Sequence, residues 1–83
     1  MAKGKLGRVL IVEDEADIGE LVEAMLGHLG YIAFVASSGA EALRLAPDYR
    51  PDIVLLDLAL AEMPGDVVMK HLQQMNPHTR VAW

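Results

Sequence analysis

The stretch DIVLLDLAL, residues 52–60, sets a single carboxylate, Asp57, inside an apolar run. Six of its nine residues are Ile, Val or Leu. A short, continuous apolar run of this kind is typical of a strand covered on both faces, as in a parallel sheet. Because an unpaired charge is expensive to bury, we expect Asp57 to have a partner or a chemical role.

The segments around this stretch alternate between the two kinds of regular structure. Apolar and β-branched runs predict strands at residues 8–12, 31–35, 52–56 and, at its start only, 79–83. Helices are expected between them at residues 17–29, from Ser38 to Pro47, and at 66–75. The order βαβαβαβ, with short connections, predicts an α/β fold with a parallel sheet and right-handed crossovers.

Local signals fix the expected helix ends. Asp17 is the expected N-cap of the first helix and Gly30 its C-cap. Ser38 and Glu41 have the spacing of a capping box, and Pro47 is expected to end the second helix. The first helix carries one apolar stripe: Ile18, Leu21, Val22, Met25, Leu26 and Leu29. The candidate core residues of the third helix are Val67, Val68, Leu72 and Met75.

Composition limits the class of protein. Eighty-three residues make at most one small domain, and 53% of them are hydrophobic, so some apolar surface is expected to meet a partner or a part of the parent protein that this chain lacks. The absence of cysteine excludes disulfides and thiolate metal sites and favours a cytoplasmic location. The net charge of -5 argues against nucleic-acid binding, and no apolar run is long enough to span a membrane. Residues 1–7 are expected to be a flexible basic leader rather than a signal peptide.

Carboxylates follow two of the predicted strands. Glu13 and Asp14 come directly after the first strand, and Asp57 lies at the end of the third. If these strands are neighbours, the three carboxylates converge at the edge where parallel sheets bind ligands. Two like charges 4 Å apart cost about 4 kcal/mol at an effective dielectric constant near 20, so either the pKa of one carboxylate rises or a cation lies among them. Oxygen ligands with open positions suit Mg²⁺.

Simpler interpretations exist for each of these acids. Asp57 could cap a turn at a strand end, and Glu13 and Asp14 could complement the dipole at the start of a helix. A dinucleotide-binding enzyme is disfavoured because the turn after the first strand is acidic rather than glycine-rich.

The chain is similar to a response-regulator receiver domain over residues 8–83. The similarity rests on VLIVEDE at residues 9–15, on DIVLLDLAL, and on the Met-Pro-Gly turn at residues 63–65. It implies a flavodoxin-like, doubly wound parallel sheet. It also implies that Asp57 accepts a phosphoryl group from a histidine kinase or phosphotransfer protein. Mg²⁺ would then be held by Glu13, Asp14, Asp57 and the backbone carbonyl of Ala59, and the domain would signal rather than act as an enzyme.

The sequence departs from the family pattern in several places. Ala61 stands where many receivers carry Pro, and Ala59 stands where a haloacid-dehalogenase-type hydrolase would need a second Asp. The family's Thr or Ser after the fourth strand has no counterpart in this sequence. Its later Lys has none either, because Lys70 lies on the third predicted helix and does not match it. We therefore expect residues 8–83 to be the N-terminal two-thirds of the domain, with its sheet truncated after the start of the fourth strand.

An exposed strand edge has consequences for assembly. An open edge is a template for pairing, which predicts a homodimer or a strand-swapped oligomer through the fourth strand, or else a fragment that is only marginally stable. The alternative function is that of a receiver-derived fragment that associates as a scaffold and has no working switch.

Overall fold

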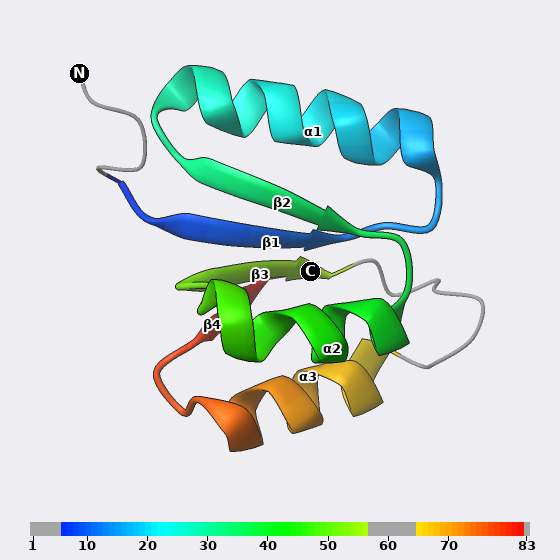
Figure 1. Cartoon of the computed structure of the whole chain (residues 1–83), viewed down its shortest axis with the longest axis vertical. Coiled ribbons are helices and arrows are strands. Elements are labelled where there is room, and N and C mark those ends of the chain that lie inside the picture. Colours follow the sequence, from blue (N-terminus) through cyan, green and yellow to red (C-terminus); the bar gives the residue numbers. More distant parts are fainter. Residues whose placement is uncertain (1–5, 57–64, 83) are drawn as a thin grey trace.

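The computed structural model describes residues 6–56 and 65–82. Its one sheet has the strand order β2-β1-β3-β4, and all pairs are parallel. The strands are β1 (Arg8–Val12), β2 (Ile32–Ala36), β3 (Ile53–Leu56) and β4 (Arg80–Ala82). The helices are α1 (Ala16–Leu29) on one face of the sheet, and α2 (Gly39–Tyr49) and α3 (Gly65–Met75) on the other (Figure 1). The predicted α/β class, element order and flavodoxin-like arrangement are confirmed.

The main core lies between the sheet and the α2–α3 layer. Leu10 of β1 pairs with Val54 of β3, and both side chains are fully buried. Val68 and Leu72 of α3 belong to the same cluster. Burying an aliphatic side chain of this size contributes about 1.5–3 kcal/mol. Val9 and Ile11 are also buried, and they alternate with the core-facing residues of β1, so this strand reads as continuously apolar because both its faces are covered.

The start of α1 differs from the prediction. The N-cap is Glu15, whose side chain makes no capping hydrogen bond, and Asp17 lies within the first turn. Asp17 as N-cap is therefore wrong, although its charge still complements the positive end of the helix dipole. Gly30 is confirmed as the C-cap. Its φ of 107° is left-handed, and its N–H donates to the carbonyl of Gly27.

The start of α2 follows the predicted capping box with one change. The Ser38 hydroxyl accepts a hydrogen bond from the backbone N–H of Glu41 at 3.0 Å. The Glu41 carboxylate, however, accepts from the backbone N–H of Ser37 at 2.9 Å rather than from that of Ser38. The box therefore closes one residue earlier in the chain than the standard motif.

Pro47 does not end α2, so that prediction is wrong. The helix continues to Tyr49 and ends at Arg50, whose φ of 48° is left-handed. Proline removes one hydrogen bond, the one its N–H would make to residue 43, and that loss falls near the helix end. The backbone N–H of Arg50 still donates to the carbonyl of Ala46 at 2.9 Å, which closes the last turn.

The apolar stripe of α1 faces largely away from the sheet. Leu21 is 61% exposed, and three further members of the stripe are exposed: Ile18, Met25 and Leu29. Val22 and Leu26 of the stripe are half-buried, and the helix approaches β2 most closely at Gly19. Gly19 is buried, and a Cβ atom added there would lie 2.8 Å from Cγ1 of Val35. This approach leaves no room for a larger residue at position 19.

The predicted core residues of α3 divide into two pairs. Val68 and Leu72 are buried, as predicted. Val67 and Met75 are exposed, at 36% and 47%, so their assignment to the core is wrong. The helical period identified the correct face, but the sheet and α2 cover only part of the apolar stripe that the sequence predicts on it.

The ends of the chain bear on the remaining predictions. Residues 1–5 lie outside the described residues, so the division into a leader and a domain at residue 8 stays a prediction.

Thr79 precedes β4 and is buried, and its hydroxyl donates to the carbonyl of Pro51 at 3.2 Å. Across the described ranges, no helix is both long enough and apolar enough to cross a bilayer.

Candidate functional site

The register of the sheet brings three strand ends to one edge. Val12, the last residue of β1, pairs with Ala36 at the end of β2 and with Leu56 at the end of β3. Glu13 and Asp14 follow β1 directly. In the sequence the residue after Leu56 is Asp57, which lies outside the described residues, as does Ala59. The convergence of Asp57 with the two acids therefore stays a prediction.

Glu13 is held at this edge by the backbone. Its N–H donates to the carbonyl of Ala36 at 3.0 Å, which extends the β1–β2 ladder by one bond. Its carboxylate oxygen Oε2 accepts from the backbone N–H of Glu15 at 3.1 Å. Glu13 is half-buried, whereas Asp14 is exposed. The first acid is thus oriented by the fold, and the second is open to a ligand.

The chemistry of these donors suits a hard cation. Carboxylate oxygens are the ligands that Mg²⁺ prefers, and it keeps several waters in its shell. Within residues 6–56 and 65–82, no group of three or more acidic, His or Cys side chains could hold a metal ion. Of the four predicted ligands, Glu13 and Asp14 lie within those ranges, while Asp57 and the carbonyl of Ala59 fall outside them, so the metal site stays a prediction.

A third carboxylate near this edge, that of Glu41, already has hydrogen-bond partners. Glu41 accepts from both the N–H and the hydroxyl of Ser37, at 2.9 and 3.4 Å. It also lies 3.9 Å from the exposed guanidinium of Arg44, a weak ion pair. Glu41 therefore serves the start of α2 rather than the acidic pair.

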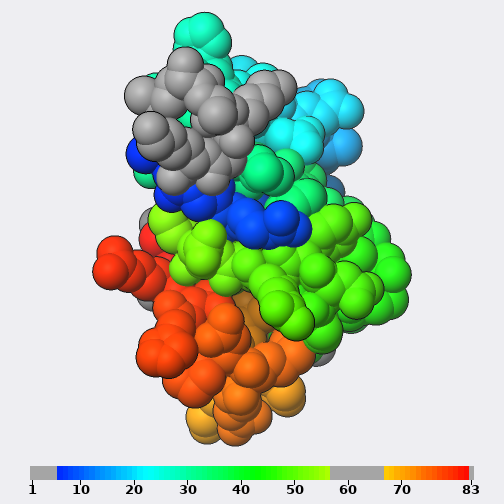
Figure 2. Space-filling model, turned by 60° about the vertical axis from the view of Figure 1, so that its left-hand side comes forward, coloured from blue at the N-terminus to red at the C-terminus, as the bar shows by residue number. Residues whose placement is uncertain are grey.

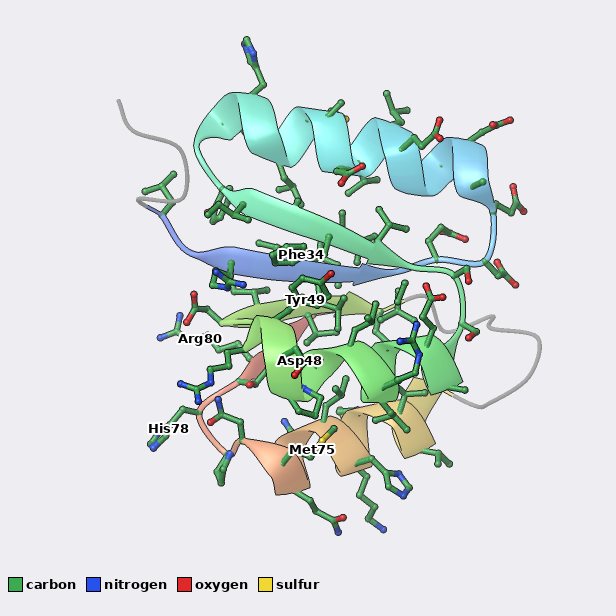
Figure 3. The ribbon with its side chains drawn as sticks, in the orientation of Figure 1. Phe34, Asp48, Tyr49, Met75, His78 and Arg80 are labelled. Carbon is green, nitrogen blue, oxygen red and sulfur yellow. The ribbon has the colours of Figure 1, made fainter. Side chains whose placement is uncertain are left out.

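The amino ends of the strands, opposite the end that carries Glu13 and Asp14, hold a cluster of side-chain contacts around Arg8 that the sequence did not reveal. Figure 2 shows this end, where the starts of β1, β3 and β4 lie side by side. The Arg8 side chain donates through Nε to the carbonyl of Tyr49 at 2.6 Å, and its Cζ lies 5.1 Å from the ring centroid of Phe34. The rings of Phe34 and Tyr49 stack with centroids 4.2 Å apart (Figure 3). Arg8 thus binds the C-terminal end of α2, where a cation is favourable.

Comparison with known proteins identifies the family. Residues 9–83 match the response regulator receiver domain. The chain is similar to sporulation initiation phosphotransferase F of Bacillus subtilis, at 34% identity over 74 residues, 89% of this chain and 60% of that protein. It is also similar to PhoP of the same organism, the alkaline phosphatase synthesis transcriptional regulatory protein, at 39% identity over 67 residues, 81% of this chain and 28% of that protein.

Solved structures give the same result for the fold. The chemotaxis protein CheY4 of Vibrio cholerae superposes with a TM-score of 0.84 at 29% identity, covering 89% of this chain and 63% of that one. A CheY-like receiver domain protein of Methanospirillum hungatei superposes with a TM-score of 0.86 at 23% identity, covering 98% of this chain and 62% of that one. The chain spans only part of each of these relatives, between 28% and 63% of their length.

Proposed function

This chain belongs to the response regulator receiver domain family, and on that premise we propose that it accepts a phosphoryl group on Asp57 from a histidine kinase or a phosphotransfer protein. The observation that carries the proposal is the β1–β3 register. Val12 and Leu56 are paired, and in the sequence the acidic pair follows one and Asp57 follows the other. The domain signals through this modification and does not turn over a substrate.

The transfer exchanges one phosphorus bond for another. A carboxylate oxygen of Asp57 attacks phosphorus, a P–O bond forms, and the P–N bond to the donor histidine breaks with its electron pair passing to the imidazole. Glu13 and Asp14 would hold Mg²⁺ with Asp57 and the carbonyl of Ala59. When bound, the ion neutralises charge on the phosphoryl oxygens. Glu13 contributes a fixed position, because the N–H of Glu15 and the Ala36 carbonyl both hold it.

The exposed apolar face of α1 is the surface on which we place the kinase. Its residues are Ile18, Leu21, Met25 and Leu29. The helix begins at Ala16, two residues after Asp14, so this face starts beside the sheet end that carries Glu13 and Asp14 and extends away from it. An exposed apolar patch beside a reactive edge marks a protein interaction site. A partner seated there can bring its phosphohistidine to the strand ends.

Intact-mass measurement with a small phosphodonor tests the chemistry. The chain should gain one phosphoryl group with Mg²⁺ and acetyl phosphate, and none after chelation of the metal or in the Asp57→Ala variant. Asp14→Asn should reduce labelling, while Asp48→Asn, an exposed acid on α2, should not. Labelling that persists in Asp57→Ala would refute the assignment of the phosphoacceptor.

Phosphotransfer from a histidine kinase that phosphorylates the unmutated chain tests the docking face. Leu21→Glu should slow transfer from this kinase and leave labelling by acetyl phosphate unchanged. Val67→Glu, an exposed apolar residue on α3, is the control and should affect neither reaction. Equal loss of both reactions in Leu21→Glu would show damage to the fold or the acidic site rather than to docking.

Location and assembly complete the proposal. We place the reaction in the cytoplasm, where the ATP that supplies histidine kinases is made. The proposal also includes a homodimer paired through β4. It rests on one feature: β4 has only β3 as a neighbour among the described strands. This edge is three residues long, which limits the pairing it can support. An assembly that forms without any labelling of Asp57 would favour the scaffold function instead.

A further inference from the structure

A hollow that the phosphoacceptor function does not use lies along the lateral edge of the sheet, the side formed by β2. An open cavity of about 860 Å³ lies between α1 and β2, lined by Glu20, Glu23 and Gly27 of the helix and by Ala33 of the strand. Figure 1 shows α1 running above β2. The three helix residues recur at the spacing of one helix face. A Cβ atom added to Gly27 would meet nothing within 4 Å, so the space beside this glycine is open.

The strand that reaches this hollow through Ile32 and Ala33, β2, has backbone groups directed outward along its free edge. β2 is an edge strand of the described sheet and has β1 as its neighbour there. The N–H of Ile32 donates to Gly7 and the carbonyl of Ala36 accepts from Glu13, so both of these residues turn their backbone groups toward β1. Strand alternation then turns the backbone groups of Ala33 and Val35 away from β1. An added strand could pair with them.

The carboxylates that line the hollow belong to Glu20 and Glu23, and His28 and Tyr31 line it as well. Glu20 and Glu23 are exposed, and neither carboxylate makes a hydrogen bond or ion pair with another described residue. A second copy of this acidic chain, paired edge to edge through β2, would set the same carboxylates against each other. A basic segment would instead neutralise them. Side chains opposite Ala33 in an added strand share its face of the sheet, the face that α1 covers.

We propose that the β2 edge binds an extended basic peptide by strand addition, with its backbone paired to Ala33 and Val35 and its cationic side chains beside Glu20 and Glu23. The hollow lies within the size range of ligand sites, and strand addition is a recurring mode of peptide recognition. The partner is therefore a protein segment with Lys or Arg at every second position. This surface is separate from the acidic edge and does not depend on phosphorylation.

Fluorescence anisotropy with a labelled peptide tests the proposal. The probe is acetyl-Lys-Val-Lys-Val-Lys-amide, and the chain should bind it saturably. The same peptide with Glu in place of Lys should not bind. Glu20→Gln and Glu23→Gln should each weaken binding about 1.5- to 5-fold, the range for exposed ion pairs. Asp48→Asn removes an equal charge from α2 and should leave binding unchanged.

Two further measurements separate strand addition from charge attraction alone. A peptide N-methylated on the backbone groups that face β2 keeps its charge and should bind at least ten-fold more weakly. Ala33→Pro removes an outward N–H from the edge, and it should weaken binding without lowering the helix content seen by circular dichroism. Equal binding of the N-methylated peptide would overturn the proposal. So would a dimer, detected by light scattering, that Ala33→Pro dissolves, because the edge would then hold a second copy.

Discussion

The two glycines of α1 give the sharpest test of how this helix packs. In an exposed helix interior, replacing Gly with Ala stabilises by about 1 kcal/mol. At Gly27 nothing opposes this gain, because an added Cβ meets nothing within 4 Å. At Gly19 the added Cβ would lie 2.8 Å from Cγ1 of Val35, so α1 or β2 must shift. Overpacking of this kind costs about 1–3 kcal/mol.

The comparison of the two variants isolates this contact. The gain in helix propensity is common to both, so Gly19→Ala should be less stable than Gly27→Ala by about 1–3 kcal/mol. For a domain of this size, that difference corresponds to a melting temperature lower by at least about 4 °C. Urea unfolding followed by far-UV circular dichroism measures both variants under the same conditions.

A double-mutant cycle identifies Val35 as the cause. In a Val35→Ala background, Cγ1 is absent, so Gly19→Ala should recover the stabilisation that Gly27→Ala shows. The reasoning is refuted if Gly19→Ala and Gly27→Ala stabilise the native chain equally. That result would mean that α1 lies farther from β2 than the structure places it.

Three further predictions concern the α2–α3 layer. Leu72→Ala, which opens a cavity in the main core, should lower the free energy of unfolding by about 2–5 kcal/mol in urea titrations; a loss below 1 kcal/mol would contradict its burial. Ser38→Ala should cost about 1 kcal/mol by removing the N-cap of α2, and Ser37→Ala, whose hydroxyl makes only a 3.4 Å contact, should cost less. Pro47→Ala restores a helical N–H near the carbonyl of Leu43 and should raise the melting temperature; a lower value would show that the proline stabilises this turn.

The sequence by itself determined the order and the kind of the elements. The apolar runs at residues 8–12 and 52–56 predicted buried parallel strands, and both strands form. Gly30 and the Ser38–Glu41 pair predicted helix ends that the structure confirms. These signals succeed because they act within a few residues: a cap or a turn depends on backbone groups that are already neighbours along the chain.

Only the tertiary structure decided which faces are covered and which residues meet. Helical period groups Leu21 with Met25, but it cannot say whether that face is buried. In the structure both side chains are exposed, and α1 lies close to β2 at Gly19. Strand pairing across 44 positions of sequence aligns Val12 with Leu56, the residues that precede Glu13 and Asp57 in the sequence. Likewise, Arg8 reaches Tyr49 only once β1 lies beside the end of α2. Such contacts depend on how elements distant in the sequence pack together, and no local pattern encodes that.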